Sequence, residues 1–96
     1  MIVAENGHCV AIRDINPQAP THILVIPRQH VASLNETKDP SIIAHMHQMA
    51  VQLAKSEGLA ERGFRTVINT NADAGQTVFH IHLHLLGGRR MNWPPG

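Results

Sequence analysis

Short apolar segments in which polar and apolar residues tend to alternate recur along the chain, and turn-forming residues separate them. Four of these segments are predicted to be strands: residues 2–5, 8–13, 21–26 and 65–69. Asn6-Gly7 lies between the first two, and this pair is typical of the two-residue type I′ turn of a β-hairpin. Pro27 ends the third segment, because proline cannot donate to a strand ladder. The pattern predicts a short antiparallel sheet.

One segment has helical spacing instead. Asp39-Pro40 places an N-cap acceptor before a proline at the first helical position, and Gly58 is suited to end a helix. The apolar positions at helical spacing between them are Ile42, Met46, Met49, Ala50 and Leu53. The sequence therefore predicts one main helix over residues 39–57.

Residues 77–86 (TVFHIHLHLL) alternate strictly and predict a fifth strand. In such a strand His80, His82 and His84 line one face. The apolar residues of the other face would then join the core: Phe79, Ile81, Leu83 and Leu85. The expected fold class is α+β, a five-stranded antiparallel sheet with one main helix, within a single domain 1–96 whose tail, residues 87–96, is irregular.

Composition and charge narrow the possible functions. Hydrophobic residues make up 43% of the 96 residues, which excludes an intrinsically disordered chain. The net charge is +1 without a basic run, so charge-driven binding to nucleic acid is not expected. No apolar stretch is long enough for a membrane span and no signal peptide is visible, so we expect a cytoplasmic protein. Cys9 is the only cysteine, which excludes an internal disulfide.

The chain has eight histidines, as many as its lysines and arginines together. Three exposed histidines on an open sheet face are one interpretation of the fifth strand. A metal site is another, but alternate strand positions are about 6.7 Å apart and positions four apart about 13 Å, so all three histidines cannot share one ion. Such a site would need another ligand, for example His22.

Phosphorus chemistry is the third interpretation, and we favour it. A neutral imidazole is a nucleophile near pH 7, and neighbouring imidazoles can hold phosphoryl oxygens or move a proton. The segment before the histidines adds Gly75 for close backbone approach, the Gln76 amide and the Thr77 hydroxyl.

The segment HIHLHLL at residues 80–86 resembles the motif of the histidine triad (HIT) family, in which three alternating histidines precede apolar residues. Residues 75–79 (GQTVF), 14–22 (DINPQAPTH) and 24–27 (LVIP) are similar to its histidine triad nucleotide-binding branch, and so is the tail that ends in WPPG. The similarity runs from the first hairpin to the last residue.

This resemblance implies a homodimer whose two sheets join across the interface, and a hydrolase that converts adenosine or guanosine phosphoramidates to the nucleoside monophosphate and an amine. His82 matches the nucleophile that takes up the nucleotidyl group, and His84 matches a histidine on the α-phosphate. His80 matches the member that supports the nucleophile, His22 a supporting histidine on the neighbouring strand, and Thr77 a hydroxyl near the leaving group. No metal or other cofactor is expected.

The resemblance also implies a nucleotide-binding surface. Asp14 matches the carboxylate that accepts hydrogen bonds from the ribose hydroxyls, while Ile12 and Leu24 match apolar contacts to the base. The other expected binding positions are Ile15, Asn16, Asn69, Gly75, Gln76, Thr77, His82 and His84. Trp93 is expected to be packed, because an exposed tryptophan leaves a large apolar surface in water.

Three features depart from the branch. Thr77 stands where serine is common, and threonine occurs there in the dinucleotide-cleaving fragile histidine triad branch, so a dinucleotide polyphosphate hydrolase is an alternative. Ile12 stands where an aromatic residue is frequent. The sequence starts at the strand that in relatives follows an N-terminal helix, so either the base is held more loosely or the chain is a shortened form. A non-catalytic purine nucleotide-binding module is the remaining alternative.

Overall fold

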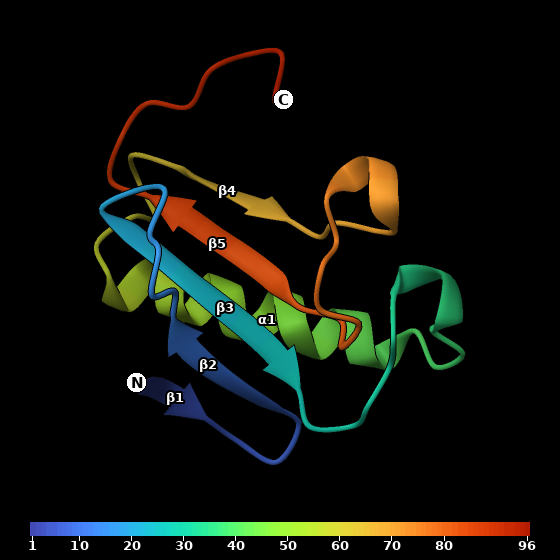
Figure 1. The fold of residues 1–96 in the computed structure, drawn as a ribbon. Coiled ribbons are helices and arrows are strands. Elements are labelled where there is room, and N and C mark those ends of the chain that lie inside the picture. The colour runs from blue at the N-terminus through green and yellow to red at the C-terminus, as the bar shows by residue number, and fades with distance from the viewer.

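The computed structural model describes residues 1–96 as one antiparallel sheet with a single long helix on one face (Figure 1). The strands are β1 (Ile2–Glu5), β2 (Cys9–Arg13), β3 (Thr21–Pro27), β4 (Phe64–Val67) and β5 (Leu83–Gly87), in the order β1-β2-β3-β5-β4. The helix α1 spans Ser41–Ser56, and two short 3-10 helices, η1 (Leu34–Glu36) and η2 (Ala72–Ala74), lie in the connections. The predicted α+β fold is confirmed.

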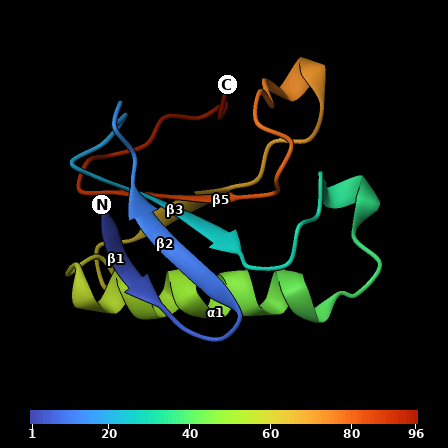
Figure 2. The same ribbon diagram turned by 60° about the horizontal axis from the view of Figure 1, so that its bottom comes forward.

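The core lies between α1 and the sheet, as Figure 2 shows with α1 beneath the strands. Ile23, Val25, Leu83 and Leu85 point from β3 and β5 toward the helix and are fully buried. Met46 and its apolar neighbours on α1 pack against them. The other face of the sheet is not covered by α1, and the loop after β2, the loop after β4 with its short helix η2, and the C-terminal tail rise around it (Figure 2).

The helix begins and ends where local chemistry favours it. Asp39 Oδ1 accepts the Ser41 N–H at 2.9 Å, but the N-cap residue is Pro40 and the helix begins at Ser41, one residue later than predicted. At the other end Gly58 has a φ of +75°, and the Leu59 N–H donates to the Ala54 carbonyl at 2.8 Å. This is the Schellman arrangement, and it confirms the predicted role of Gly58.

The predicted strand over residues 77–86 is wrong in its first half. Strand β5 begins only at Leu83, where it pairs with Val25 of β3. Continuing the ladder would bring Ile81 opposite Pro27, which has no N–H to donate. The chain instead bends at residues 78–80, and the Ile81 N–H donates to the Val31 carbonyl at 2.7 Å.

Three smaller expectations are also corrected. Neither Asn6 nor Gly7 has a positive φ, because the Asn6 side chain accepts the N–H groups of His8 and Cys9 and closes a different turn. Phe79 is half exposed because it lies in the bend and not in a strand. Trp93 is 82% exposed within the chain, with only the Arg65 guanidinium 6.0 Å above its ring. No helix of the protein combines the length and the apolar character needed to cross a bilayer.

Candidate active site

The candidate site lies on the sheet face that α1 leaves open. Strand alternation directs Ile23 and Leu85 to the core, and therefore directs His22 and His84 to the opposite face. Leu24 pairs directly with Ile12 of β2 on one side and with His84 of β5 on the other. Two half-buried apolar side chains therefore lie in one row with a histidine, as expected for a surface that contacts a base.

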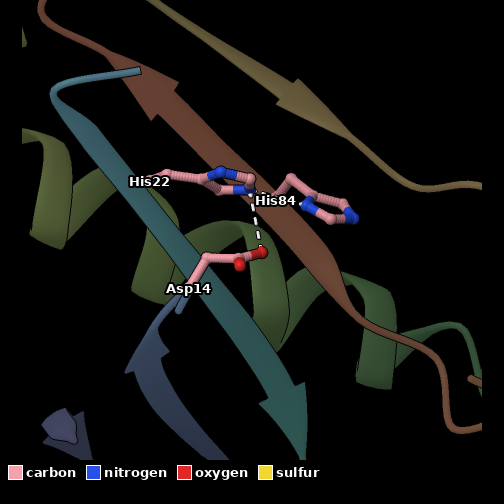
Figure 3. A group of neighbouring side chains, drawn as sticks. All are labelled: Asp14, His22 and His84. Atoms are coloured by element: carbon pink, nitrogen blue, oxygen red, sulfur yellow. Dashed lines mark hydrogen bonds and ion pairs between the residues drawn. The ribbon is translucent and has the colours of Figure 1, made fainter. Parts of the chain in front are cut away.

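Three polar side chains converge at this face (Figure 3). His22 Nε2 lies 2.8 Å from His84 Nδ1 and 3.4 Å from Asp14 Oδ2. His22 comes from β3 and is buried, His84 comes from β5, and Asp14 directly follows β2. Three neighbouring strands thus bring together residues that lie up to 70 positions apart in the sequence.

A backbone donor fixes which nitrogen of His22 carries the proton. The Gln18 N–H donates to His22 Nδ1 at 3.0 Å, so Nδ1 is the acceptor and the hydrogen of the neutral ring is on Nε2. That Nε2–H donates to His84 Nδ1, and the hydrogen of a neutral His84 is therefore on its Nε2. His84 can accordingly donate a hydrogen bond from Nε2 to a ligand on this face.

Burial keeps both of these histidines neutral. Desolvation lowers the pKa of His22, although the Asp14 carboxylate partly opposes the shift. Desolvation also lowers the pKa of His84, and the neighbouring His82 and His22 lower it further. At pH 7 the pair is therefore uncharged, as the tautomer assignment requires.

His82 precedes β5 and has one nitrogen engaged. Its Nδ1 lies 2.9 Å from the His80 carbonyl oxygen, which can only accept, so Nδ1 carries the hydrogen and Nε2 holds a free lone pair. The ring centroids of His82 and His84 are 5.1 Å apart. A nucleophilic nitrogen and a hydrogen-bond donor are therefore side by side.

The ring of His80 is directed elsewhere, which corrects the expected row of three histidines. Its Nε2 donates to the Pro27 carbonyl at 2.9 Å, and its ring meets the edge of His30 at a centroid distance of 5.0 Å. His80 supports His82 through its backbone carbonyl and not through its ring. The bend at residues 78–80 separates the two rings.

The Gln76 side chain is used to hold the loop before β5 together. Gln76 is buried, its Oε1 accepts the Asn71 N–H at 2.8 Å, and its Nε2 donates to the Ala32 and Val78 carbonyls at 2.8 and 3.2 Å. Because both amide hydrogens are used, the expected amide donor to a phosphate is not available. Thr77, which follows it, is exposed and its hydroxyl has no partner within the chain.

The remaining expected positions lie around the edge of the site. Gly75 is exposed with a φ of +85°, and Asn69 is half-buried after β4. The Asn16 N–H donates to Asp14 Oδ1 at 2.8 Å, which shapes the loop after β2. Ile15 is fully exposed and does not join the apolar row.

Sequence reasoning missed the contribution of Gln18. It acts through its backbone N–H, which every residue except proline has, so no residue type could have revealed it. His30 was also given no part, although its ring contacts His80. Its position after Pro27-Arg28-Gln29 carries no periodic signal.

Comparison with known proteins identifies relatives over nearly the whole chain. A family model for the HIT domain matches residues 1–91. The crystal structure of a HIT family hydrolase from Legionella pneumophila is 52% identical, with a TM-score of 0.95 over 99% of this chain and 87% of that one. A 14 kDa zinc-binding protein of Zea mays is 48% identical over 99% of this chain and 77% of its own length. A histidine triad nucleotide-binding protein from Candida albicans is 27% identical, with a TM-score of 0.82 over 97% of this chain and 73% of that one.

Proposed function

This chain belongs to the HIT domain family, and on that premise we propose that it hydrolyses purine nucleoside phosphoramidates. The products are a nucleoside monophosphate and an amine, and residues 1–96 act as one domain. The observation that carries the proposal is the hydrogen bond from His82 Nδ1 to the His80 carbonyl at 2.9 Å. It leaves His82 Nε2 unprotonated and directed away from the backbone, as a nucleophile requires.

The first step is attack of His82 Nε2 on the α-phosphorus. A new nitrogen–phosphorus bond forms, the bond from phosphorus to the substrate amine breaks, and the electron pair of that bond leaves with the amine. The imidazole becomes cationic as it bonds to phosphorus, and the His80 carbonyl stabilises the positive charge through the Nδ1 hydrogen. In the second step water attacks phosphorus, the bond to Nε2 breaks with its electron pair returning to the ring, and free His82 is restored. The proton that the water loses passes to solvent and balances the proton that the amine takes up in the first step.

The other site residues have matching roles. The Nε2–H of His84 donates to a phosphoryl oxygen, and its neutrality follows from its lowered pKa. The departing amine needs a proton, which the exposed Thr77 hydroxyl can relay. Asp14 holds the ribose hydroxyls, and Ile12 and Leu24 contact the base.

The name of the maize relative raises the question of zinc. The cluster of Asp14, His22 and His84 offers one possible ligand atom from each residue, and these atoms lie within 4.8 Å of one another. Carboxylate oxygen and imidazole nitrogen are both donor types that zinc accepts. Zinc on His22 Nε2 would require the hydrogen on Nδ1, where the Gln18 N–H already points. Two donors would then face each other, so the cluster does not fit a zinc ion and no catalytic step is assigned to one.

We also propose that the protein works as a homodimer. Strand β4 is an edge strand that pairs only with β5, and its Phe64 is partly exposed. Val51 on the outer face of α1 is 45% exposed. A second copy paired along β4 would continue the sheet and cover these apolar side chains.

Turnover of an adenosine phosphoramidate by the purified protein, followed by release of the amine, tests the proposed activity. We expect hydrolysis that persists after exhaustive chelation, and a nucleotidyl adduct on His82 in peptides from a quenched reaction. An adduct on His80 or His84, or binding without turnover, would contradict the mechanism. Turnover of dinucleotide polyphosphates in preference to phosphoramidates would assign the substrate to the fragile histidine triad branch.

A further inference from the structure

The C-terminal tail is connected to the site through a single residue. Arg89 Nε, two residues after β5, donates to the Gln18 carbonyl at 3.0 Å. The N–H of the same Gln18 donates to His22 Nδ1 at 3.0 Å, and His22 donates onward to His84 at 2.8 Å. The tail and the histidine pair are thus linked through the backbone of Gln18, whose carbonyl accepts from Arg89 and whose N–H, in the preceding peptide group, donates to His22.

We infer that Arg89 is a positioning residue that holds Gln18 in place and thereby fixes the tautomers of His22 and His84. The inference concerns the protonation pattern of the free protein. Its consequence for turnover rests on the proposed phosphoramidase function.

Close packing supports a specific contact between the tail and this loop. Gly88 has a φ of +90°, and a Cβ placed on it would lie 2.9 Å from Pro20 Cβ. The tail therefore approaches the loop at a point where only glycine fits without strain, and this approach brings Arg89 next to Gln18. The guanidinium is fixed further because its other end donates to the Arg90 carbonyl at 3.1 Å.

The other bonds of the loop do not hold the Gln18 carbonyl. The Asn16 N–H donates to Asp14 Oδ1, and the Gln18 side-chain amide donates to the Asn16 carbonyl at 3.0 Å. Both are local to residues 14–18, and neither involves the Gln18–Ala19 carbonyl. Without Arg89 that peptide loses its contact from outside the loop, and the backbone on either side of the Gln18 Cα, including the Gln18 N–H, can shift. Arg89 is the side chain from outside the loop that bonds the Gln18 carbonyl.

Release of Gln18 has a defined chemical effect. Without the Gln18 N–H, His22 Nδ1 is free to carry the hydrogen, and Nε2 then becomes an acceptor. His84 Nδ1 must in that case donate to His22, and His84 Nε2 loses its hydrogen. His84 can then no longer donate to a phosphoryl oxygen, so the loss affects the chemical step more than binding of the base.

The test compares Arg89→Gln with Arg90→Gln, which removes the same charge from the next residue without touching the bonds to Gln18. The ring 15N chemical shifts of His22 and His84 in the free protein report directly which nitrogen carries the hydrogen. We expect the Nε2–H form for both histidines in the unchanged protein and in Arg90→Gln, and a substantial Nδ1–H population for His22 in Arg89→Gln. Arg89→Lys should restore part of the Nε2–H form, because an ammonium can donate to the same carbonyl. Unchanged ring shifts in Arg89→Gln would overturn the inference.

Kinetics with an adenosine phosphoramidate separate this inference from the proposed function. We expect kcat to fall about tenfold in Arg89→Gln with KM changed less than about threefold, and both constants to be unchanged in Arg90→Gln. A protein that hydrolyses no phosphoramidate would contradict the proposed function, while the ring shifts would still decide the role of Arg89. Normal turnover in Arg89→Gln would contradict the role of the tail in catalysis.

Discussion

The three triad histidines have three different environments, although the sequence presents them as equivalent. His80 donates to a backbone carbonyl of β3, His82 donates to the carbonyl of His80, and His84 accepts from His22. His80 Nδ1 and His82 Nε2 are both left unprotonated, but it is the His82 ring that lies beside His84, at a centroid distance of 5.1 Å. The division of labour among the three therefore follows from what each ring is bonded to.

Replacing His82 tests this assignment. In His82→Asn we expect hydrolysis to fall by several powers of ten, because the covalent route is lost, while nucleotide affinity changes less than about tenfold. Initial rates and calorimetric binding of adenosine monophosphate measure the two effects. His30→Asn, which alters an exposed ring that contacts His80 and not His82 Nε2, serves as the control and should retain most of the activity.

The buried histidines also predict how stability depends on pH. Burial lowers the pKa of His22 and of His84, so below about pH 6.5 the unfolded chain binds protons that the folded protein does not. The contribution of these two histidines to the free energy of unfolding should therefore be complete above about pH 6.5. It should decrease as the pH falls from about 6.5 toward the lowered pKa values of the folded protein. Urea denaturation over a series of pH values measures this dependence.

A matched pair of variants isolates the contribution of His22. His22→Gln should flatten the pH dependence, whereas His47→Gln, on the exposed side of α1, should leave it as it is. If the free energy of unfolding depends on pH equally steeply in the two variants, the role of burial at His22 is contradicted.

At the scale of elements, the short length of β5 determines the shape of the site. The chain before Leu83 leaves the sheet and packs against the segment after β3, through the bonds from His80 to Pro27 and from Ile81 to Val31. The buried Gln76 side chain fixes the preceding part of the loop through its bonds to the backbone of Asn71, Ala32 and Val78. A regular strand would have kept His80 and His82 on one face and left the His80 carbonyl directed to a neighbouring strand.

Gln76→Glu tests the role of this loop. The substitution removes the amide hydrogens donated to the Ala32 and Val78 carbonyls. Because Val78 is exposed, only the half-buried Ala32 carbonyl is left without a donor, and an unmet group of this kind costs about 1–3 kcal/mol. We expect a loss of unfolding free energy in that range together with reduced turnover, because Thr77 and His82 lose their support. Gln52→Glu, an exposed position on α1, is the control and should change the stability by less than about 0.5 kcal/mol.

At the scale of the whole molecule, the two edges of the sheet differ. At the β1 edge Ile2 is 56% exposed, whereas at the β4 edge Phe64 lies beside the tail that carries the exposed Trp93. A dimer through β4 and α1 would remove Phe64 and Trp93, the apolar side chains at the β4 edge, from water. It would also account for a tryptophan that is 82% exposed within the chain.

The oligomeric state can be measured directly. Sedimentation at micromolar concentration should give twice the 10.6 kDa mass of the chain. Val51→Lys on α1 should shift the equilibrium toward the monomer, because a charge would be buried in the interface. Ile2→Lys makes the same kind of change at the β1 edge and should leave the dimer intact; a monomeric unchanged protein that retains activity would contradict the proposal.

Local patterns in the sequence were sufficient for the fold class and for the family. Alternation predicted β1, β2 and β3, helical spacing and the Asp39 and Gly58 signals predicted α1, and the histidine spacing indicated the family. These features depend on the local backbone conformation, in which the direction of the side chains repeats with a fixed period, so a few consecutive residues show which side chains are buried. The start of β5 was missed because it depends on a proline that lies on a different strand.

Only the tertiary structure decided the protonation pattern and the roles that follow from it. The sequence placed Asp14, His22 and His84 in the site, but their convergence and the hydrogen on each ring depend on pairing between β3 and β5 and on a backbone N–H of Gln18. The use of Gln76 in the loop likewise depends on carbonyls of residues up to 44 positions away. A hydrogen bond requires distance and direction between particular atoms, and for residues so far apart in the chain only the fold supplies both.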